Sequence, residues 1–161
     1  DVRHGDLRDP AVLEALGGPF DVVTANPPYL GPEGRKLPLH PQRRYCYYEL
    51  RGGVEVFARA AAGQLAVGGA FCMVHMISRA EDALRAVRAA GLSPERRLVA
   101  MARGHPKWLI LVSRRADDPS GSGEPREEVL EVRDLAGAWT GVWDSVCRDV
   151  GAFQLPAPEP Q

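Results

Sequence analysis

The stretch that decides the fold is FDVVTANPPY, residues 20–29. Its first six residues form a short apolar run rich in β-branched side chains, which predicts a buried strand of a parallel sheet. The run ends at Asn26, and two prolines and Tyr29 follow. Asn-Pro and Pro-Pro pairs are common in turns, and a tyrosine there can simply cover the core. Whether this turn is functional or only structural therefore depends on where it lies in the fold.

Helix and strand patterns alternate on both sides of this stretch. A short helix is predicted over residues 9–18, with Asp9 as its cap and Pro10 in its first turn. The other predicted elements are a loop over 30–44, helices over 48–69, 79–92 and 139–147, a buried strand over 70–77, two strands over 96–102 and 107–115, and an edge strand over 128–134.

This alternation predicts an α/β fold with a largely parallel sheet and an antiparallel strand near the C-terminus. We expect one domain over residues 1–155, with a mobile linker over 117–127 and a disordered tail over 156–161. In such sheets ligands bind outside the carboxyl ends of the strands. The NPPY segment follows a strand directly and is therefore expected at the functional edge.

Composition limits the classes of function. The chain has 161 residues, 45% of them hydrophobic, and a formal net charge of −1, so any basic surface must be local. No apolar run approaches the length of a membrane span. The three cysteines, Cys46, Cys72 and Cys147, show no paired spacing and predict free thiols in a reducing cytoplasm, with no metal site.

The residues of the turn suit one kind of substrate. Asn26 offers a side-chain carbonyl and Pro27 a backbone carbonyl, so two N–H protons of an amino group can be accepted. Pro28 stiffens the turn. Tyr29 offers an aromatic face on which a base can stack, worth about 1–3 kcal/mol. The turn is therefore predicted to hold an amino group on a planar ring, with its lone pair free to attack an electrophile.

NPPY after an apolar strand resembles motif IV of the class I S-adenosylmethionine-dependent amino methyltransferases. That group includes RNA and DNA adenine-N6 methyltransferases and the glutamine-N5 methyltransferases of release factors. The segments LAVGGAFCMVH, RGHPKWLILVSRR and EVLEVRD are also similar to the family. Taken together they most resemble the bacterial tRNA adenine-N6 methyltransferases that act on a valine tRNA.

The resemblance implies a fold, a cofactor and a set of site residues. The chain would be the C-terminal part of a doubly wound, Rossmann-like sheet. S-adenosyl-L-methionine would be the methyl donor, held by Asp6, Leu7 and Asn26. The catalytic residues would be Asn26, Pro27, Pro28 and Tyr29, and the substrate would be adenine in RNA, with a role in tRNA processing.

Two features of the family are missing from this sequence. No glycine-rich turn precedes residue 20, and no second strand ends in an acid for the donor ribose. We therefore expect the chain to be incomplete at its N-terminus, or its donor-binding half to be another polypeptide. Alone, it is expected to bind the donor poorly or not at all and to be inactive.

A basic segment follows the motif and could line a path for RNA phosphates, with Tyr29 and nearby tyrosines stacking on bases. A solvated loop explains the same charges. The residues expected to contact RNA are Arg35, Lys36, Arg43 and Arg44, with His40, Tyr45, Tyr47 and Tyr48 close to them. Arg103, His105 and Lys107 could also touch RNA, although a tight turn between antiparallel strands explains Gly104 and Pro106.

Other interpretations stay open. A glutamine side chain of a protein or adenine in DNA could be the substrate, although the basic, tyrosine-rich segment favours RNA. A non-catalytic, methyltransferase-like RNA-binding module is an alternative of another class. His75 lies within an apolar strand and is interpreted as a core histidine with its hydrogen bonds satisfied, and not as a catalytic base. The three tryptophans are interpreted as packing residues.

Overall fold

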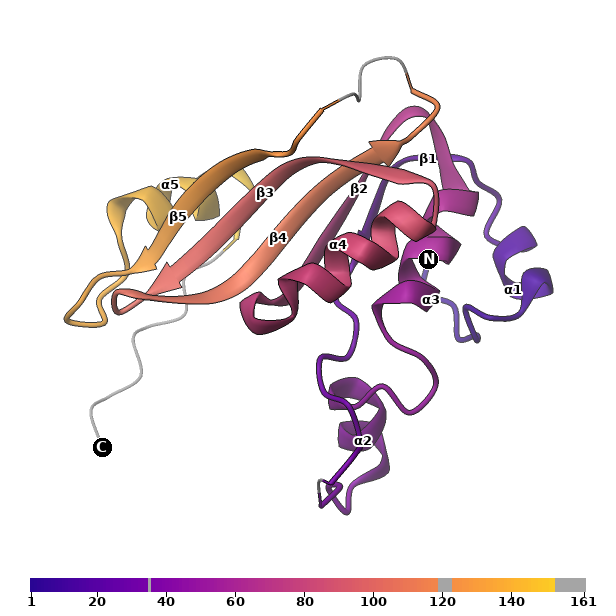
Figure 1. Ribbon diagram of the computed structural model, residues 1–161, viewed down its shortest axis with the longest axis horizontal. Helices are drawn as coiled ribbons and strands as arrows, with labels where there is room; N and C mark the ends of the chain where they lie inside the picture. The colour runs from indigo at the N-terminus through magenta and orange to yellow at the C-terminus, as the bar shows by residue number, and fades with distance from the viewer. Residues whose placement is uncertain (35, 119–122, 153–161) are drawn as a thin grey trace.

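A computed structural model describes residues 1–34, 36–118 and 123–152. Its centre is a five-stranded sheet with the order β1-β2-β4-β3-β5 (Figure 1). β1 is parallel to β2, and β3 is parallel to β5, whereas β4 is antiparallel to both of its neighbours. The strands are β1 (Phe20–Ala25), β2 (Leu65–Met76), β3 (Leu92–Ala102), β4 (His105–Arg115) and β5 (Arg126–Arg133).

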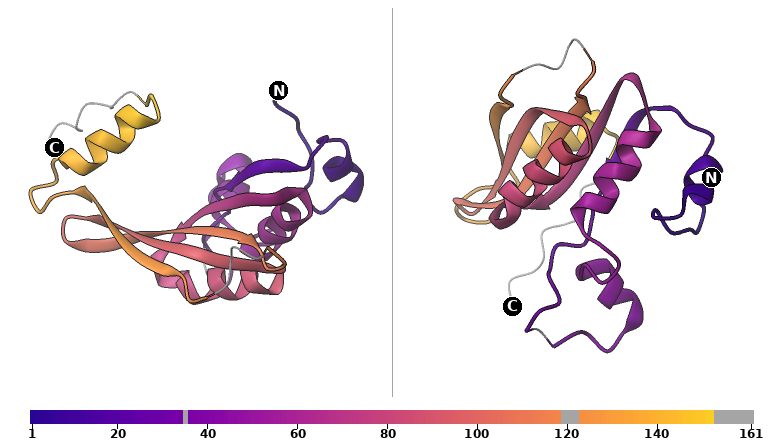
Figure 2. Two further views of the ribbon diagram at one scale, coloured as in Figure 1. Left: turned by 90° about the horizontal axis from the view of Figure 1, so that it is seen from above. Right: turned by 45° about the vertical axis from the view of Figure 1, so that its right-hand side comes forward.

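Helices lie on both faces of the sheet. α3 and α4 cover one face, and α5 lies on the opposite face beside β5, as the views from the front and from above both show (Figures 1 and 2). α2 stands apart from the sheet (Figure 1). The helices are α1 (Pro10–Glu14), α2 (Pro41–Tyr47), α3 (Val54–Gln64), the 3-10 helix η1 (Ile77–Arg79), α4 (Ala80–Ala89) and α5 (Gly141–Asp149).

The α/β class and the antiparallel strand near the C-terminus are confirmed. The sheet is mixed, however, because two of its four strand pairings are antiparallel. β4 causes this, since it returns through a hairpin and inserts between β2 and β3. No helix in the described part of the chain is long and apolar enough to cross a membrane.

The core lies between the sheet and the α3–α4 layer. Phe71 and Met73 of β2 and Leu109 and Leu111 of β4 are almost completely buried there. α4 faces them with apolar residues at helical spacing, including Leu84 and Val87. Burying such side chains stabilises the fold by roughly 1.5–3 kcal/mol each. This layer fixes the carboxyl ends of β1 and β2, where the NPPY segment lies.

β1 departs from its prediction in burial. Its bounds and its parallel pairing match the expected strand. Its side chains are mainly exposed, however, because β1 is the edge strand and has a neighbour on one side only. Val22 is 61% exposed. The prediction of a buried strand was therefore wrong for the described residues.

The single helix predicted over residues 48–69 was wrong at both ends. α3 begins at Val54, after a break at Gly52 and Gly53, and ends at Gln64. Residues from Leu65 onward belong to β2, because Leu65 pairs with Phe20 of β1. An alanine-rich segment lacks the pattern that separates helix from strand, and the tertiary pairing decides its conformation.

The loop predicted over 30–44 and the linker predicted over 117–127 each contain regular structure. α2 begins at Pro41, a residue that suits the first turn of a helix. β5 begins at Arg126, inside the predicted linker. Residues 119–122 of that linker and the predicted tail over 156–161 lie outside the described residues. The capped helix at Asp9 and the last helix are confirmed, as α1 and α5.

Candidate functional site

The segment Asn26–Tyr29, here called the NPPY turn, follows β1 directly at the carboxyl edge of the sheet. Pro27 and Pro28 are buried, whereas Asn26 is exposed and Tyr29 is half-buried. The prolines therefore anchor the turn in the fold and leave the amide at the surface. Asn26 is thus accessible for the predicted acceptor role, whereas the burial of Pro27 keeps the second predicted acceptor, its backbone carbonyl, away from the surface.

The two side chains of the turn that carry the predicted chemistry contact each other. The Tyr29 hydroxyl donates a hydrogen bond to the Asn26 side-chain carbonyl. This contact fixes which end of the amide faces the tyrosine. Since a carbonyl oxygen can accept two hydrogen bonds, one acceptor position on Asn26 remains for a ligand. Burial raises the pKa of Tyr29, so the hydroxyl keeps its proton and stays a donor.

The Tyr29 ring is held by two aromatic neighbours. His75 of β2 lies edge-on to it, with ring centroids 5.4 Å apart, and Trp108 of β4 lies tilted at 5.2 Å. His75 is fully buried, and neither of its ring nitrogens has a hydrogen-bond partner among the described residues. Burial, with Arg79 nearby, lowers the pKa of His75. His75 is thus a core residue, as expected, but among the described residues its ring nitrogens lack the hydrogen bonds predicted from the sequence, and it packs directly under the turn.

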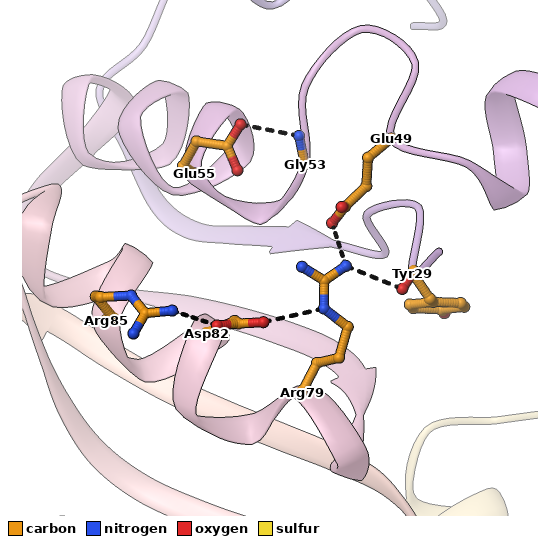
Figure 3. A network of polar contacts seen from close by, with 7 residues as sticks. All are labelled: Tyr29, Glu49, Gly53, Glu55, Arg79, Asp82 and Arg85. Atoms are coloured by element: carbon orange, nitrogen blue, oxygen red, sulfur yellow. Dashed lines mark hydrogen bonds and ion pairs between the residues drawn. The ribbon is translucent and has the colours of Figure 1, made fainter. Parts of the chain in front are cut away.

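Arg79 ties the NPPY turn to two other segments (Figure 3). Its guanidinium donates to the Tyr29 backbone carbonyl at 3.2 Å and pairs with Glu49 at 2.8 Å and Asp82 at 3.2 Å. Hydrogen bonding to Glu49 raises the pKa of Arg79, so its charge is permanent. The backbone of the turn is also bonded to the end of α2, because the Tyr29 and Leu30 amides donate to the Tyr47 carbonyl.

A pocket of about 240 Å³ lies beside the turn, and we call it the tyrosine pocket. It brings the predicted donor-binding residues Asp6 and Leu7 next to Pro28, although these segments are separate in the sequence. Its remaining lining residues are Gly5, Tyr45, Tyr48, Arg51, Gly52, Val56 and Phe57. Arg51 stacks over the Tyr45 ring at 4.4 Å. The pocket therefore has aromatic walls, one cation and one carboxylate.

The Asp6 carboxylate already has a partner. Both of its oxygens accept hydrogen bonds from the Arg8 guanidinium, at 2.9 and 2.6 Å. These bonds hold the pKa of Asp6 well below its usual range, so it is an anion at neutral pH. A ligand group at Asp6 therefore has to share the carboxylate with Arg8.

The predicted RNA-contacting residues do not share one location. Lys36 and Arg43 are exposed. Arg44 is half-buried, and its guanidinium donates to the Pro38 carbonyl at 2.5 Å, so it braces the loop before α2. Tyr45 and Tyr48 line the tyrosine pocket, while Arg43 lines a separate hollow with Cys46 and Tyr47. Arg35 lies outside the described residues.

Sequence reasoning missed Glu49, Arg79 and Arg51 as parts of the site. Arg79 had one usable signal, since it follows the end of a buried strand, where α/β folds place their ligands. Its contact with Tyr29 spans 50 residues of sequence, and no local pattern predicts such a pairing. Among the described residues, no group of three or more His, Cys, Asp or Glu side chains could hold a metal ion.

Neither protein-family models nor curated proteins provide a match for this chain. The function therefore has to be argued from the geometry of the NPPY turn and the tyrosine pocket.

Proposed function

We propose that this chain carries the substrate-side part of an S-adenosylmethionine-dependent methyltransferase that acts on the N6 amino group of adenine in RNA, with tRNA as the substrate class. One observation carries the proposal. The exposed Asn26 carbonyl stands on a turn anchored by buried prolines and lies directly beside the aromatic ring of Tyr29. An acceptor and a ring held together in this way suit an amino group on a flat base.

The tyrosine pocket fits the methyl donor in its chemical character. Tyr45, Tyr48 and Phe57 supply aromatic and apolar walls for an adenine ring, and Asp6 supplies an anionic acceptor for its amino group. Leu7 lines the same pocket. Bound S-adenosylmethionine would supply an electrophilic methyl group. The pocket adjoins Pro28, so a donor there and a base at Tyr29 would be neighbours.

The chain's own residues then act by orientation. The free acceptor position on Asn26 takes one amino proton, which directs the lone pair away from the turn. Pro27 is fully buried, so a role for its carbonyl as the second acceptor requires the turn to open when the base binds. The Tyr29 ring stacks on the base after it has left its own stack. Positioning and electrostatics supply most of the rate in such a step, and no strong base is required. With the donor bound, its methyl carbon would pass from the sulfonium sulfur to the oriented amine, S-adenosylhomocysteine would be the leaving group, and the methylated amine would release a proton to solvent.

The exposed side chains around α2 favour a nucleic acid as substrate. Lys36 and Arg43 have no acidic partner among the described residues. Tyr45 and Tyr47 of α2 are about half exposed. Cations interleaved with aromatic rings suit phosphates and unstacked bases. We infer that the segment 36–47, which contains α2, lies along the RNA strand that carries the target base.

The test is methyl transfer from labelled S-adenosylmethionine by the full-length protein, with tRNA, DNA and protein substrates in parallel. Digestion of the methylated RNA to nucleosides and mass spectrometry should identify N6-methyladenosine. Asn26→Ala should abolish transfer while circular dichroism stays unchanged. Thr24→Ala, an exposed change two residues away, is the matched control and should stay active. Label in glutamine or DNA, or full activity of Asn26→Ala, would refute the proposal.

A further inference from the structure

The hairpin between β3 and β4 ends in three basic residues, Arg103, His105 and Lys107, which we call the basic tip. All three are exposed, and none forms an ion pair within the described residues. The tip belongs to the same edge of the sheet as the NPPY turn. Trp108, the next residue along β4, contacts the Tyr29 ring at 5.2 Å.

The rest of the same hairpin shows the opposite pattern. Away from the tip, its arginines are neutralised by acids, with N–O distances of 2.7–3.0 Å. The pairs are Arg96–Glu128, Arg97–Glu127, Arg114–Glu95 and Arg115–Asp117. The near-neutral net charge of the chain therefore does not show that the paired and unpaired basic residues of this hairpin lie in different places. Along this hairpin, unpaired positive charge is found at the edge that carries the NPPY turn.

The turn itself explains Gly104 but not Arg103. The two turn residues have φ values of 55° and 73°. Such a two-residue hairpin turn favours Asn-Gly or Gly-Gly, because a side chain at positive φ is strained. Arginine at the first position works against the fold locally. Its guanidinium lies beside Gly137 and remains exposed, so the charge is presented at the edge.

We propose that the basic tip binds the phosphate backbone of the nucleic acid whose base reaches Tyr29. This inference rests on the proposed function and adds a second contact to it. Strand residues are about 3.3 Å apart, so Lys107 and His105 lie within about 10 Å of Trp108. Phosphates on one strand are about 3.4 Å apart along a helix. The tip is therefore within reach of the phosphates of the target nucleotide and its immediate neighbours.

The experiment measures binding of a fluorescently labelled single-stranded oligoadenylate to the full-length protein over a series of salt concentrations. Arg103→Gly and Lys107→Gln are combined, because glycine suits the positive φ and preserves the turn. Removing two phosphate contacts should lower the slope of log K against log salt by about 1.4, or about 0.7 per contact for a single strand. The control combines Arg59→Gln on α3 with Arg148→Gln on α5, both exposed, and should keep the wild-type slope.

Three results would contradict the inference. An unchanged slope in the Arg103→Gly, Lys107→Gln variant would remove the tip from the nucleic-acid path. An equal fall in the control variant would show that general charge, and not the tip, governs binding. If the tip variant loses affinity for polyglutamate but not for the oligonucleotide, the tip binds an acidic protein instead. Failure of the wild-type protein to bind any oligonucleotide would refute the proposed RNA substrate itself, and so is distinguishable from these outcomes.

Discussion

The two faces of the sheet are formed by the same strands, but their side chains differ in burial. On β2, Phe71 and Met73 point into the layer formed by α3 and α4 and are almost completely buried. Their sequence neighbours Cys72 and Val74 point to the opposite face and remain half-buried in a shallow groove beside Asn26. Alternation along a strand produces this division. It shows that apolar sequence alone does not define the core, because in the described part of the chain α3 and α4 pack over the face that carries Phe71 and Met73.

The largest effect should come from the covered face. Phe71→Ala removes a fully buried ring, and we expect the free energy of unfolding to fall by about 3–5 kcal/mol. Val74→Ala, from the opposite face, should lower it by about 1 kcal/mol or less, since part of the side chain is already in water. Urea unfolding of the two variants measures the difference. Equal losses would show that both faces are equally well packed.

A second prediction concerns the polar end of the covered face, where Arg79 joins three segments. Arg79→Ala leaves Glu49, which is largely buried, without its cation, and should lower stability by about 1–3 kcal/mol. Arg96→Ala is the matched control, because its pair with Glu128 is more exposed and worth about 0–1 kcal/mol. Urea midpoints of both variants decide the point. A loss as small as that of the control would mean that Arg79 does not fix the NPPY turn.

His75 makes the covered face sensitive to pH. Burial lowers its pKa in the folded state below the ordinary value of 6.5. As the pH falls through that value the unfolded chain gains a proton that the folded chain does not, so stability should decrease toward lower pH. The wild-type protein should therefore lose more stability than His75→Leu between neutral and mildly acidic pH. Parallel pH dependences of the unfolding midpoint in the two proteins would show that His75 does not contribute.

The smallest expected effect is a difference in cysteine reactivity. It tests the face of the sheet opposite α3 and α4, which we call the open face. Cys72 lies there half-buried, and burial raises the pKa of its thiol. Cys46 on α2 is exposed. Because the thiolate is the reactive form, iodoacetamide at mildly alkaline pH should modify Cys46 before Cys72. Peptide mass spectrometry at successive times gives the order. Faster modification of Cys72 would mean that the groove on this face is more open than the structure shows.

Local patterns were enough where the physical cause is local. The cap of α1 at Asp9, the strand 20–25 and the turn after it could all be predicted from short sequence signals. The exposure of β1 could not, because it depends on which strands stand beside it. The start of β2 at Leu65 was missed for the same reason, since pairing with Phe20 overrides the helical character of the preceding alanines.

In the candidate site too, the local residues could be predicted from the sequence and the distant contacts could not. Asn26, the two prolines and Tyr29 form a motif whose chemistry can be read from residue types. The contacts that hold the motif come from distant parts of the chain, namely Glu49, Arg79 and Trp108. The sequence also did not reveal that Arg44 braces its own loop while Arg43 stays exposed. Residue type was enough to propose which groups touch a ligand, but it was a poor guide to the groups that support them.

The position of β1 at the sheet edge has a consequence for handling the chain. Among the described residues, its outer backbone groups have no strand partner. Edges of this kind template pairing between molecules unless lysine, proline or a covering element blocks them. β1 contains neither lysine nor proline, and its one charged residue is Asp21. In the described part of the chain, this edge is therefore the place where a further strand would pair. A lysine in place of the exposed Val22 should act as a gatekeeper and suppress that association.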